Sequence, residues 1–587
     1  MENILQKKIT LLKTNIKYVA FFSNFFVLWS ISLQAQNFQW AKSIGSPVFT
    51  NENVYTSCLD SSGNIYIVGQ FANSVDFDPG PGVFTMNGGF YGNIFIAKFD
   101  ASGNFIWAKN FKGNNYTYPV KTILLDDFGN ILICGLFLGT TDFDPGNGIY
   151  SLSTNSYRDN FICKLNSNGD FVWAKKFGSK MSDHYISLAL DDANNMYLCS
   201  AFSDTIDVDP GIGIYNLVSN GSSDIYILKL NSSGNFVWAK QLGNIGTDYG
   251  NSVCKGENGT MYFAGEFRLT VDFNPSPAIN YLTASNISNF GGDMFILKLD
   301  TMGNYVWAKR IGGTSATFPA SMKLDNSNNL IVGGDFYGTA DFDPNAATFL
   351  MTAPPTFQNG FIIKFNSLGN LIWANHLSSS GASWVNSIDI DASGNIFSTG
   401  YFCDTTNFDL TSTNQIKVAI GLRDIFIQQL DSASNFLWLK TFGIVSGANQ
   451  GVSILHDAST KAIIVSGDFS DTLDFNPPSA NYLSHEWWAD VFIVKYSING
   501  VGIIDNPKSS DRYSINPNPT KGNVTLNLNQ QSSLVEICIV NTLGEVLSKK
   551  QYFNTSKLQI DIDGPSGLYF LHVKSDVGVR TLKVIKE

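Results

Sequence analysis

A tryptophan that returns at a nearly constant interval constrains the fold of this 587-residue chain more than any other feature. The intervals between successive copies are 67, 66, 65, 69, 66 and 65 residues, and most copies are followed by Ala-Lys. Self-similarity at a fixed period indicates one structural unit repeated along the chain. The seven copies are Trp40, Trp107, Trp173, Trp238, Trp307, Trp373 and Trp438.

Each period also contains two polar turns of the type Asp-x-x-Gly-Asn, such as residues 60–64 and 100–104, and each turn leads into an apolar run. The Asp carboxylate can accept hydrogen bonds from the turn amides, and Gly tolerates the left-handed conformation that closes a type I turn with a bulge. Two such hairpins predict four strands per period. In one period these strands are expected near Gly250–Lys255 and at Met261–Phe267, Asp293–Leu299 and Tyr305–Lys309.

Four-stranded units repeated seven times predict an all-β, seven-bladed β-propeller over residues 36–502, because radial closure hides the strand edges. An open solenoid would need atypical capping repeats, and none is evident. The first tryptophan lies in a strand without preceding partners, while the last period lacks a tryptophan strand. We therefore expect Phe38–Lys42 to complete the seventh blade and to bury Trp40 against the sixth. The alternative is that Gly502–Ile504 closes this blade.

The composition agrees with a strand-rich chain. Aromatic residues make up 13%, and charged residues make up 15%, below the roughly 25% of average globular proteins. This mixture suits short strands and tight turns rather than helical bundles. The formal net charge of -11 removes nucleic acid as a default partner. The charge is +3 in residues 1–35, +3 in residues 512–587 and -17 between them, which suggests three regions with different roles.

The N-terminal region has the layout of a secretory signal peptide, predicted over residues 1–35. Lysines in the first 17 residues precede an apolar run at residues 18–33, and Ala35 is a plausible cleavage position. Asn24 interrupts a run that is already short for crossing a bilayer. An uncleaved anchor is the alternative. We expect no transmembrane span in the mature chain.

The C-terminal region changes character after a linker at residues 503–511. Residues 512–587 contain several short runs in which apolar and polar residues alternate, and this pattern predicts a small β-sandwich. The sequence closely resembles the type A sorting domain of the type IX secretion system; an ordinary structural β-domain is the alternative. The positions that match the sorting motif are Pro517, Asn518, Pro519, Gly522, Gly544, Gly567, Tyr569, Lys583 and Lys586.

This resemblance implies that the type IX secretion machinery is a partner. It also implies that the protein crosses the periplasm and is secreted or attached to the outer surface. The periodic region, roughly residues 38–500, resembles the bacterial SBBP β-propeller repeat, which implies an exported propeller without one established activity. The tryptophan strand is also similar to that of quinoprotein propellers. Those enzymes generally have eight blades, and many carry an adjacent cysteine pair that this chain lacks.

The acidic segment Asp-Phe-Asp-Pro-Gly recurs once per period, for example at residues 76–80 and 142–146. Two carboxylates two residues apart could contribute to a calcium site, but an EF-hand-like loop needs further ligands and a distal Glu. Asp and Pro also form turns without metal. We expect no cofactor, and calcium remains the open alternative. The seven cysteines share no spacing and contain no Cys-x-x-Cys pair, so neither a disulfide framework nor a zinc site is expected.

No catalytic residue is predicted. A glycosidase would need two carboxylates that differ from the repeat, whereas the acidic positions recur from period to period as in a scaffold. The histidines are dispersed, and their spacing suggests no Ser-His-Asp triad.

Aromatic residues in the connections before the first strand of each period are the candidate ligand-binding residues. We expect them to ring one face near the central channel, where they could contact sugar rings or extended peptides. Simple packing at the blade tops is the alternative. The predicted function is an exported binding or adhesion module for glycan or protein ligands, with an extracellular polysaccharide-acting hydrolase or lyase as the alternative. The candidate residues are Tyr55, Tyr118, Tyr185, Tyr249, Phe318 and Trp384.

Overall fold

The computed structural model divides into two compact units, of which one holds residues 36–500 and the other includes residues 501–587. No helix within the described ranges is long and apolar enough to cross a membrane. The predicted signal peptide (1–35) and linker (503–511) lie outside these ranges. The described residues are 36–46, 52–115, 119–155, 157–181, 183–285, 291–410, 414–445, 447–477, 482–498, 514–541, 546–575 and 578–587.

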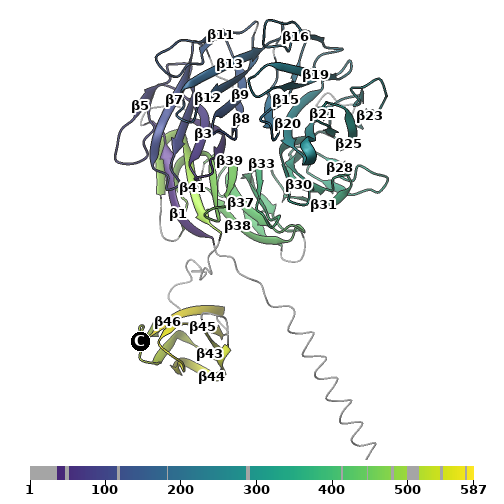
Figure 1. The fold of residues 1–587 in the computed structure, drawn as a ribbon. Helices are drawn as coiled ribbons and strands as arrows, with labels where there is room; N and C mark the ends of the chain where they lie inside the picture. The colour runs from purple at the N-terminus through teal and green to yellow at the C-terminus, as the bar shows by residue number, and fades with distance from the viewer. Residues whose placement is uncertain are drawn as a thin grey trace, which may run out of the picture. The chain divides into compact units, whose positions relative to one another are not determined.

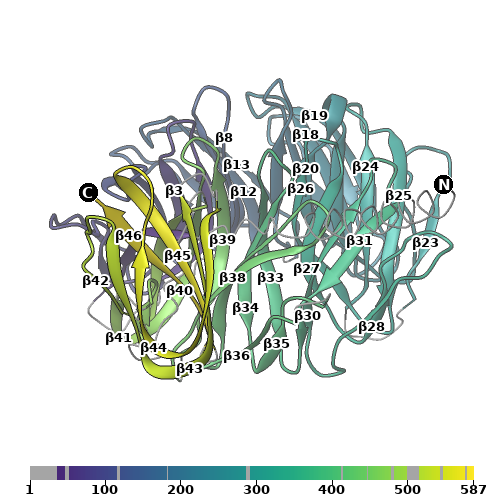
Figure 2. The same cartoon turned by 90° about the horizontal axis from the view of Figure 1, so that it is seen from below.

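The first unit is an all-β propeller (Figure 1). Over its described residues, strand pairing gives seven antiparallel sheets that each contain four strands in the order A-B-C-D, and a further hairpin extends two of these sheets to six strands. In Figure 2 strands of neighbouring blades, such as β27 and β30 beside β33 and β34, stand next to one another. The A strands are β2 (Asn53–Leu59), β8 (Val120–Leu125), β14 (Ser187–Leu190), β20 (Tyr249–Lys255), β26 (Thr317–Leu324), β33 (Ser383–Ile390) and β39 (Gln450–Asp457).

The B and C strands are the buried middle of each blade, which explains their nearly continuous apolar runs. The B strands are β3 (Ile65–Phe71), β9 (Ile131–Phe137), β15 (Met196–Phe202), β21 (Met261–Phe267), β27 (Leu330–Phe336), β34 (Ile396–Phe402) and β40 (Ala462–Asp474). The C strands are β6 (Asn93–Phe99), β12 (Asp159–Leu165), β18 (Asp224–Leu230), β24 (Asp293–Leu299), β30 (Asn359–Phe365), β37 (Asp424–Leu430) and β41 (Tyr482–Ser497).

The D strands carry the periodic tryptophans and alternate between exposed and buried residues. The period chosen to illustrate the prediction has strands at β20, β21, β24 and β25, so its four expected strands are confirmed. The D strands are β7 (Phe105–Gly113), β13 (Phe171–Phe177), β19 (Phe236–Leu242), β25 (Tyr305–Gly313), β31 (Leu371–His376), β38 (Phe436–Phe442) and β1 (Asn37–Ile44).

The polar turns form as their sequence predicts. Asp60 Oδ1 accepts hydrogen bonds from the backbone N–H groups of Ser62 (3.0 Å) and Asn64 (2.9 Å). Gly63 adopts a left-handed φ of 78°, which a Cβ would disfavour. The C–D hairpins contain the expected bulge, for example where the register shifts between Lys98 and Phe99. The turn between β20 and β21 instead contains a short 3₁₀ segment, η1 (Glu257–Gly259).

Short hairpins follow the B strands and contain the repeated acidic segment. Asp76 Oδ1 accepts the N–H groups of Asp78 (3.1 Å) and Phe84 (2.8 Å), and Asp78 Oδ1 accepts that of Gly80 (2.8 Å). Thus both carboxylates bind turn amides. The hairpin strands are β4 (Ser74–Asp76), β5 (Thr85–Asn87), β10 (Thr140–Asp142), β11 (Ser151–Ser153), β16 (Thr205–Asp207), β17 (Asn216–Val218), β22 (Thr270–Asp272), β23 (Tyr281–Thr283), β28 (Thr339–Asp341), β29 (Leu350–Thr352), β35 (Thr405–Asn407) and β36 (Ile416–Val418); β32 (Ser378–Ser379) pairs with β35.

Apolar clusters join each blade to the next. In one of them, Leu132 and Ile162 from the second blade pack with Leu198 and Tyr226 from the third. The tryptophans add a second contact, because a Cβ built at Gly169 would lie 3.0 Å from Trp107 of the preceding blade. Glycine in the C–D turn therefore makes room for the neighbouring indole.

The N-terminal strand β1 pairs with β41, as expected, and becomes the D strand of the blade that contains β39 and β40. Figure 1 shows the purple β1 beside the green β41. The expectation that Trp40 packs against the sixth blade is wrong. Its indole lies against Gly103 in the first blade and joins the apolar cluster there. The indoles of Trp107, Trp173, Trp238 and Trp307 likewise lie against a C–D turn glycine of the following blade. Trp40 is also half-buried rather than fully buried.

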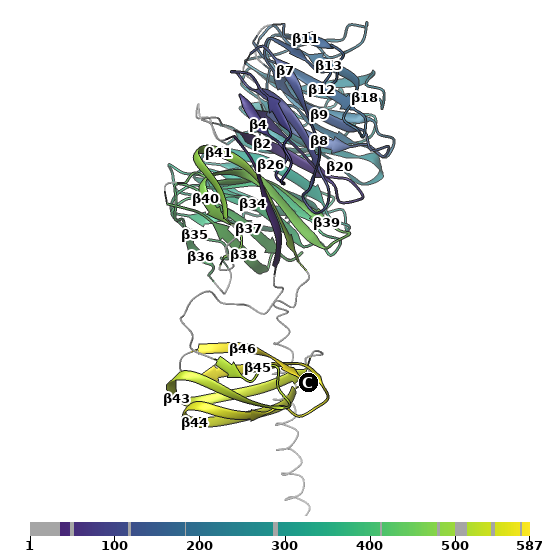
Figure 3. The same ribbon diagram turned by 90° about the vertical axis from the view of Figure 1, so that its left-hand side faces the viewer.

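The C-terminal unit is a single antiparallel sheet that curls around one apolar cluster. β43 pairs with β42, β44 and β45, and its pairing with β44 is interrupted between Asn527 and Ser532. Figure 3 shows β45 and β46 opposite β43 and β44. The strands are β42 (Ser514–Asn516), β43 (Asn523–Asn541), β44 (Val546–Asp561), β45 (Gly567–Ser575) and β46 (Gly578–Lys586).

Candidate ligand-binding cavities

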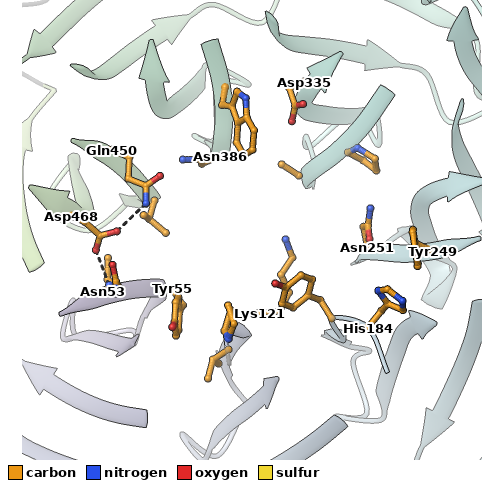
Figure 4. A pocket seen from close by; sticks show the side chains of 18 of the residues that line it. Asn53, Tyr55, Lys121, His184, Tyr249, Asn251, Asp335, Asn386, Gln450 and Asp468 are labelled. Atoms are coloured by element: carbon orange, nitrogen blue, oxygen red, sulfur yellow. Dashed lines mark hydrogen bonds between the residues drawn. The ribbon is translucent and has the colours of Figure 1, made fainter. Parts of the chain in front are cut away.

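A cavity of about 650 Å³ lies where the A strands of the propeller converge (Figure 4). Every blade contributes to its wall through an A strand or the residues directly before it. The lining residues are Asn53, Val54, Tyr55, Pro119, Val120, Lys121, His184, Tyr185, Tyr249, Asn251, Glu266, Pro319, Ala320, Asp335, Trp384, Asn386, Gln450, Val452 and Asp468.

A β-bulge in the A strand aims side chains into this cavity. In β2, for example, the register shifts between Val54 and Thr56, so Tyr55 has no partner residue in β3. A bulge bends its strand and re-aims the extra residue. Six A strands have this irregularity, and all six bulged residues line the cavity: Tyr55, Lys121, Asn251, Ala320, Asn386 and Val452.

Four of the six aromatic residues singled out from the sequence line the central cavity: Tyr55, Tyr185, Tyr249 and Trp384. Phe318 lines an adjoining cavity, and Tyr118 lies outside the described residues. The aromatic residues occupy different strand positions: Tyr55 is bulged, whereas Tyr249 pairs with Glu266. The aromatic pattern therefore identified residues near the channel, but it did not predict which position each one occupies in its strand.

The adjoining cavity measures about 940 Å³ and shares two wall residues, Asp335 and Trp384, with the central cavity. Its other walls combine aromatic, hydroxyl and amide side chains. They are formed by Gly291, Thr314, Ser315, Ala316, Phe318, Tyr337, Pro355 and Gln358.

Three buried carboxyl groups in the central wall were missed by the sequence analysis: Glu266, Asp335 and Asp468. Each is the residue before last in the B-strand core, opposite Tyr249, Phe318 and Gln450 respectively. The corresponding residues in the other blades are Gln70, Leu136, Ala201 and Tyr401. The expectation that acidic positions simply recur as scaffold is therefore wrong at this position, and alignment of the seven B strands would have revealed the exception.

The protein environment shifts these carboxyl groups toward their neutral form. Burial raises the pKa of Asp335 to about 8, and the charge of Glu266 adds to this effect. Burial also raises the pKa of Glu266 to about 7, although the backbone N–H of Gly292 (3.2 Å) opposes the shift. The pKa of Asp468 rises to about 7 through burial, against hydrogen bonds from Gln450 (3.0 Å) and the Val54 N–H (2.8 Å).

Burial also favours the neutral form of two basic side chains in the wall, whose pKa values it lowers. Burial, assisted by the charge of Arg158, lowers the pKa of His184 to about 4. The His184 ring lies 4.1 Å from that of Tyr249, measured between centroids. Burial also lowers the pKa of Lys121. Low solvation disfavours the charged form of both acids and bases, so this wall suits a ligand whose polar groups replace the missing water.

No group of three or more His, Cys, Asp or Glu side chains with the geometry for a metal ion occurs within the described ranges. The wall instead offers aromatic faces beside amide and carboxyl groups. Such walls can stack on a ring and hydrogen-bond its substituents.

The described sorting-motif residues gather where the last strand meets the start of the C-terminal unit. Asn518 Oδ1 accepts the N–H of Ile585 (2.8 Å), and Lys586 Nζ donates to the carbonyls of Ile562 and Gly564 (2.8 Å each). The Tyr569 hydroxyl donates to the Pro565 carbonyl at 2.5 Å. Pro517 and Pro519 flank Asn518, Gly522 adopts φ 122° beside Lys586, Gly567 begins β45, and Lys583 pairs with Phe570; Gly544 lies outside the described residues.

Residues 514–587 match the family described as "Secretion system C-terminal sorting domain". The tail is thus a sorting domain that implies export, in agreement with the sequence resemblance.

Two curated proteins are similar in sequence to this chain. The chain is 23% identical over 551 residues to an uncharacterized WD repeat-containing protein, L264, of Acanthamoeba polyphaga mimivirus, covering 78% of this chain and 38% of that protein. It is 27% identical over 160 residues to the regulatory protein FlaEY of Caulobacter vibrioides, covering 26% of this chain and 16% of that protein. The chain therefore spans well under half the length of these curated relatives.

The comparison with solved structures finds a similarity to the WD40 domain of Neurospora crassa Pan2. It has a TM-score of 0.35 and 11% identity, and the match covers 76% of this chain and 90% of that domain.

Proposed function

We propose that this protein is an exported propeller of the SBBP repeat type that binds an extracellular glycan in its central cavity. The observation that carries the proposal is the convergence of Tyr55, Tyr185, Tyr249 and Trp384 with amide and carboxyl side chains on one cavity wall. A sugar ring presents an apolar face for stacking and an edge of hydroxyl groups. Asn251, Asn386 and Gln450 supply amides that can donate to and accept from these hydroxyls.

A glycan panel tests this function. We expect saturable binding of at least one glycan to the full chain, without products, by calorimetry and mass spectrometry. Tyr249→Ala should weaken binding about tenfold by removing a stacking face. The matched control is Tyr281→Ala in the same blade, because Tyr281 is 61% exposed on the outer hairpin. Equal loss in both variants, or no binding to any glycan, would contradict the proposal.

A polysaccharide-acting hydrolase is the second candidate. Its supporting observation is the interaction of two buried carboxyl groups, Glu266 and Asp335, whose raised pKa values suit a proton donor. Accumulation of cleaved glycan in the same panel, abolished by Glu266→Gln, would favour this candidate over the binding module.

Export is proposed to begin with a signal peptide at residues 1–35 and to end with recognition of the tail by the type IX secretion machinery. Surface attachment or release would follow. Deletion of residues 512–587 should leave a folded propeller in the periplasm, since these residues belong to the separate C-terminal unit. Cell fractionation checks the location, and circular dichroism checks the fold. Surface delivery of the truncated chain at the normal level would refute the sorting role.

A further inference from the structure

Asp335 is a buried carboxyl group in the wall of both cavities. Its side chain is 7% exposed. Glu266 accepts the Gly292 N–H, and Asp468 accepts two hydrogen bonds, whereas no side chain or backbone donor among the described residues bonds the Asp335 carboxyl. A buried carboxyl group without a donor is costly, so this site favours a ligand that donates.

Aromatic residues line the same cavity walls as this carboxyl group. Phe318 pairs directly with Asp335 across the β26–β27 ladder. In the blades on either side, the same register position of the A strand holds Tyr249 and Trp384. The Trp384 ring lies 5.4 Å from that of Tyr401, which in turn carries the Arg423 guanidinium 4.7 Å from its centroid. Three consecutive blades thus carry an aromatic residue at this A-strand position, and in two of them it pairs with an acidic residue.

Aromatic faces beside a carboxyl group without a donor suit a ligand that carries a positive charge better than an uncharged sugar. Aromatic faces attract cations through their quadrupole, and a primary ammonium group can donate up to three hydrogen bonds to carboxylates. A quaternary ammonium would satisfy the aromatic faces but would leave Asp335 without a donor. The walls beyond Asp335 include Ser315, Tyr337 and Gln358, which offer partners for hydroxyl groups next to the amine.

We propose that the adjoining cavity, which Asp335, Phe318 and Trp384 line beside the central cavity, binds the protonated amino group of an amino sugar. This inference rests on the proposed glycan-binding function and narrows it to sugars with a free amine. The ammonium donates to the Asp335 carboxylate while the ring lies against Trp384. Asp335 carries a proton at neutral pH, so its O–H bond breaks on binding, the proton leaves to solvent, and the resulting carboxylate pairs with the ammonium.

The groups that face Asp335 define the proton balance of this step. Glu266 comes from the adjacent blade, and Tyr337 and Tyr401 come from its own and the next blade. Burial raises the pKa of both tyrosines, so they remain neutral near pH 7. The charge of the bound ammonium offsets the new charge of Asp335 at neighbouring Glu266, so Glu266 neither gains nor loses a proton. The expected release is therefore the one Asp335 proton per amine.

The test compares glucosamine with N-acetylglucosamine and glucose by calorimetry on the full chain. We expect glucosamine to bind about tenfold tighter than the other two sugars, because only it supplies an ammonium. Titration in two buffers of different ionisation enthalpy should show release of about one proton for glucosamine and none for glucose. Both measurements use the unmodified chain, so neither depends on the folding of a variant.

Asp335→Asn should abolish this preference for glucosamine and the proton release. Asp204→Asn is the matched control: Asp204 is an exposed residue with a left-handed φ of 62°, which Asn also tolerates. Equal binding of glucosamine and N-acetylglucosamine would overturn the amine assignment and leave glycan binding intact. Retention of the glucosamine preference in Asp335→Asn would also overturn it. Failure of all three sugars, and of the wider panel, would contradict the proposed function itself.

Discussion

At the scale of single residues, the channel wall is defined by two positions that vary between blades. One is the bulged residue of the A strand, and the other is the B-strand position that holds Glu266, Asp335 and Asp468 in three of the blades. Residues that build the blade repeat because every blade needs the same turn and the same core. Residues that face the channel have no such constraint, so variation within the repeat marks the site.

Asp335 gives a stability prediction. Because burial and Glu266 raise its pKa to about 8, the folded state holds the Asp335 proton more strongly than the unfolded state does. Stability from this group is fully present below about pH 4 and is lost as the pH rises toward 8. Asparagine does not ionise in this range, so Asp335→Asn abolishes the decrease in stability with rising pH. We expect the variant to gain about 1–3 kcal/mol over the wild type between pH 5 and pH 8.

Urea denaturation at intervals between these pH values measures the difference. Asp204→Asn should show little pH-dependent change, since its carboxylate is exposed. A difference between Asp335→Asn and wild type that is constant with pH would contradict a raised pKa at this residue.

The sequence predicted the neighbourhood of the site better than its chemistry. Tyr249 and Trp384 could be placed near the channel because they precede recognisable turns and strands. The role of Asp335 could not be predicted, because acidic residues are common in the repeat and most of them cap turns. The carboxylates of Asp341 and Asp343, for example, accept hydrogen bonds from turn N–H groups, whereas that of Asp335 does not. Burial and the absence of a donor depend on packing between blades, which a linear sequence does not specify.

At the scale of the strand and hairpin, the Lys in the C strand links three elements. In β30, Lys364 Nζ lies 2.8 Å from Asp325 Oδ2 in the A–B turn and donates to the Ser432 carbonyl of the next blade at 3.1 Å. The same pattern recurs at Lys495, which contacts Asp457 and the Ala101 carbonyl. In β37 this position is Gln429, which accepts from the Trp438 indole instead.

Loss of the ion pair between Lys364 and Asp325 should lower the free energy of unfolding. Lys364 and Asp325 have side chains that are 5% and 6% exposed, so Lys364→Met leaves a buried carboxylate without its cation. We expect a loss of about 3 kcal/mol in the free energy of unfolding. Adding Asp325→Asn should recover part of that loss, because the remaining group is then neutral.

Chemical denaturation of both variants provides the measurement. Lys417→Met is the control, since Lys417 is exposed in β36, and it should change stability by less than about 0.5 kcal/mol. Similar losses for Lys364→Met and Lys417→Met would show that the buried pair contributes little.

At the scale of the whole propeller, pairing between distant ends of the chain closes the ring. β1 pairs with β41 from Asn37 to Ile44. Two hydrogen bonds also join the seventh blade to the first. Ser57 Oγ donates to Ser453 Oγ at 2.8 Å, and Ser46 Oγ donates to the Ser74 carbonyl at 3.0 Å. The period predicted which strand closes the ring. It did not predict which neighbour Trp40 would cover, because that depends on how the twisted blades pack.

The closure makes the final prediction quantitative. Trp40→Ala removes a half-buried indole from the first-blade cluster and should cost about 2–3 kcal/mol. Deletion of residues 36–44 removes the same indole and also unpairs the edge of β41, exposing its N–H and C=O groups. The deletion should therefore lower the unfolding midpoint in urea further than Trp40→Ala does, and it should promote association through the open edge. Light scattering detects that association, and Trp238→Ala, which truncates an equivalent indole inside the ring, is the control for tryptophan loss alone. The prediction is contradicted if the deletion variant has the same urea midpoint as Trp40→Ala and stays monomeric. Loss of the strand would then add nothing to loss of its indole, and pairing with β1 would not stabilise the ring.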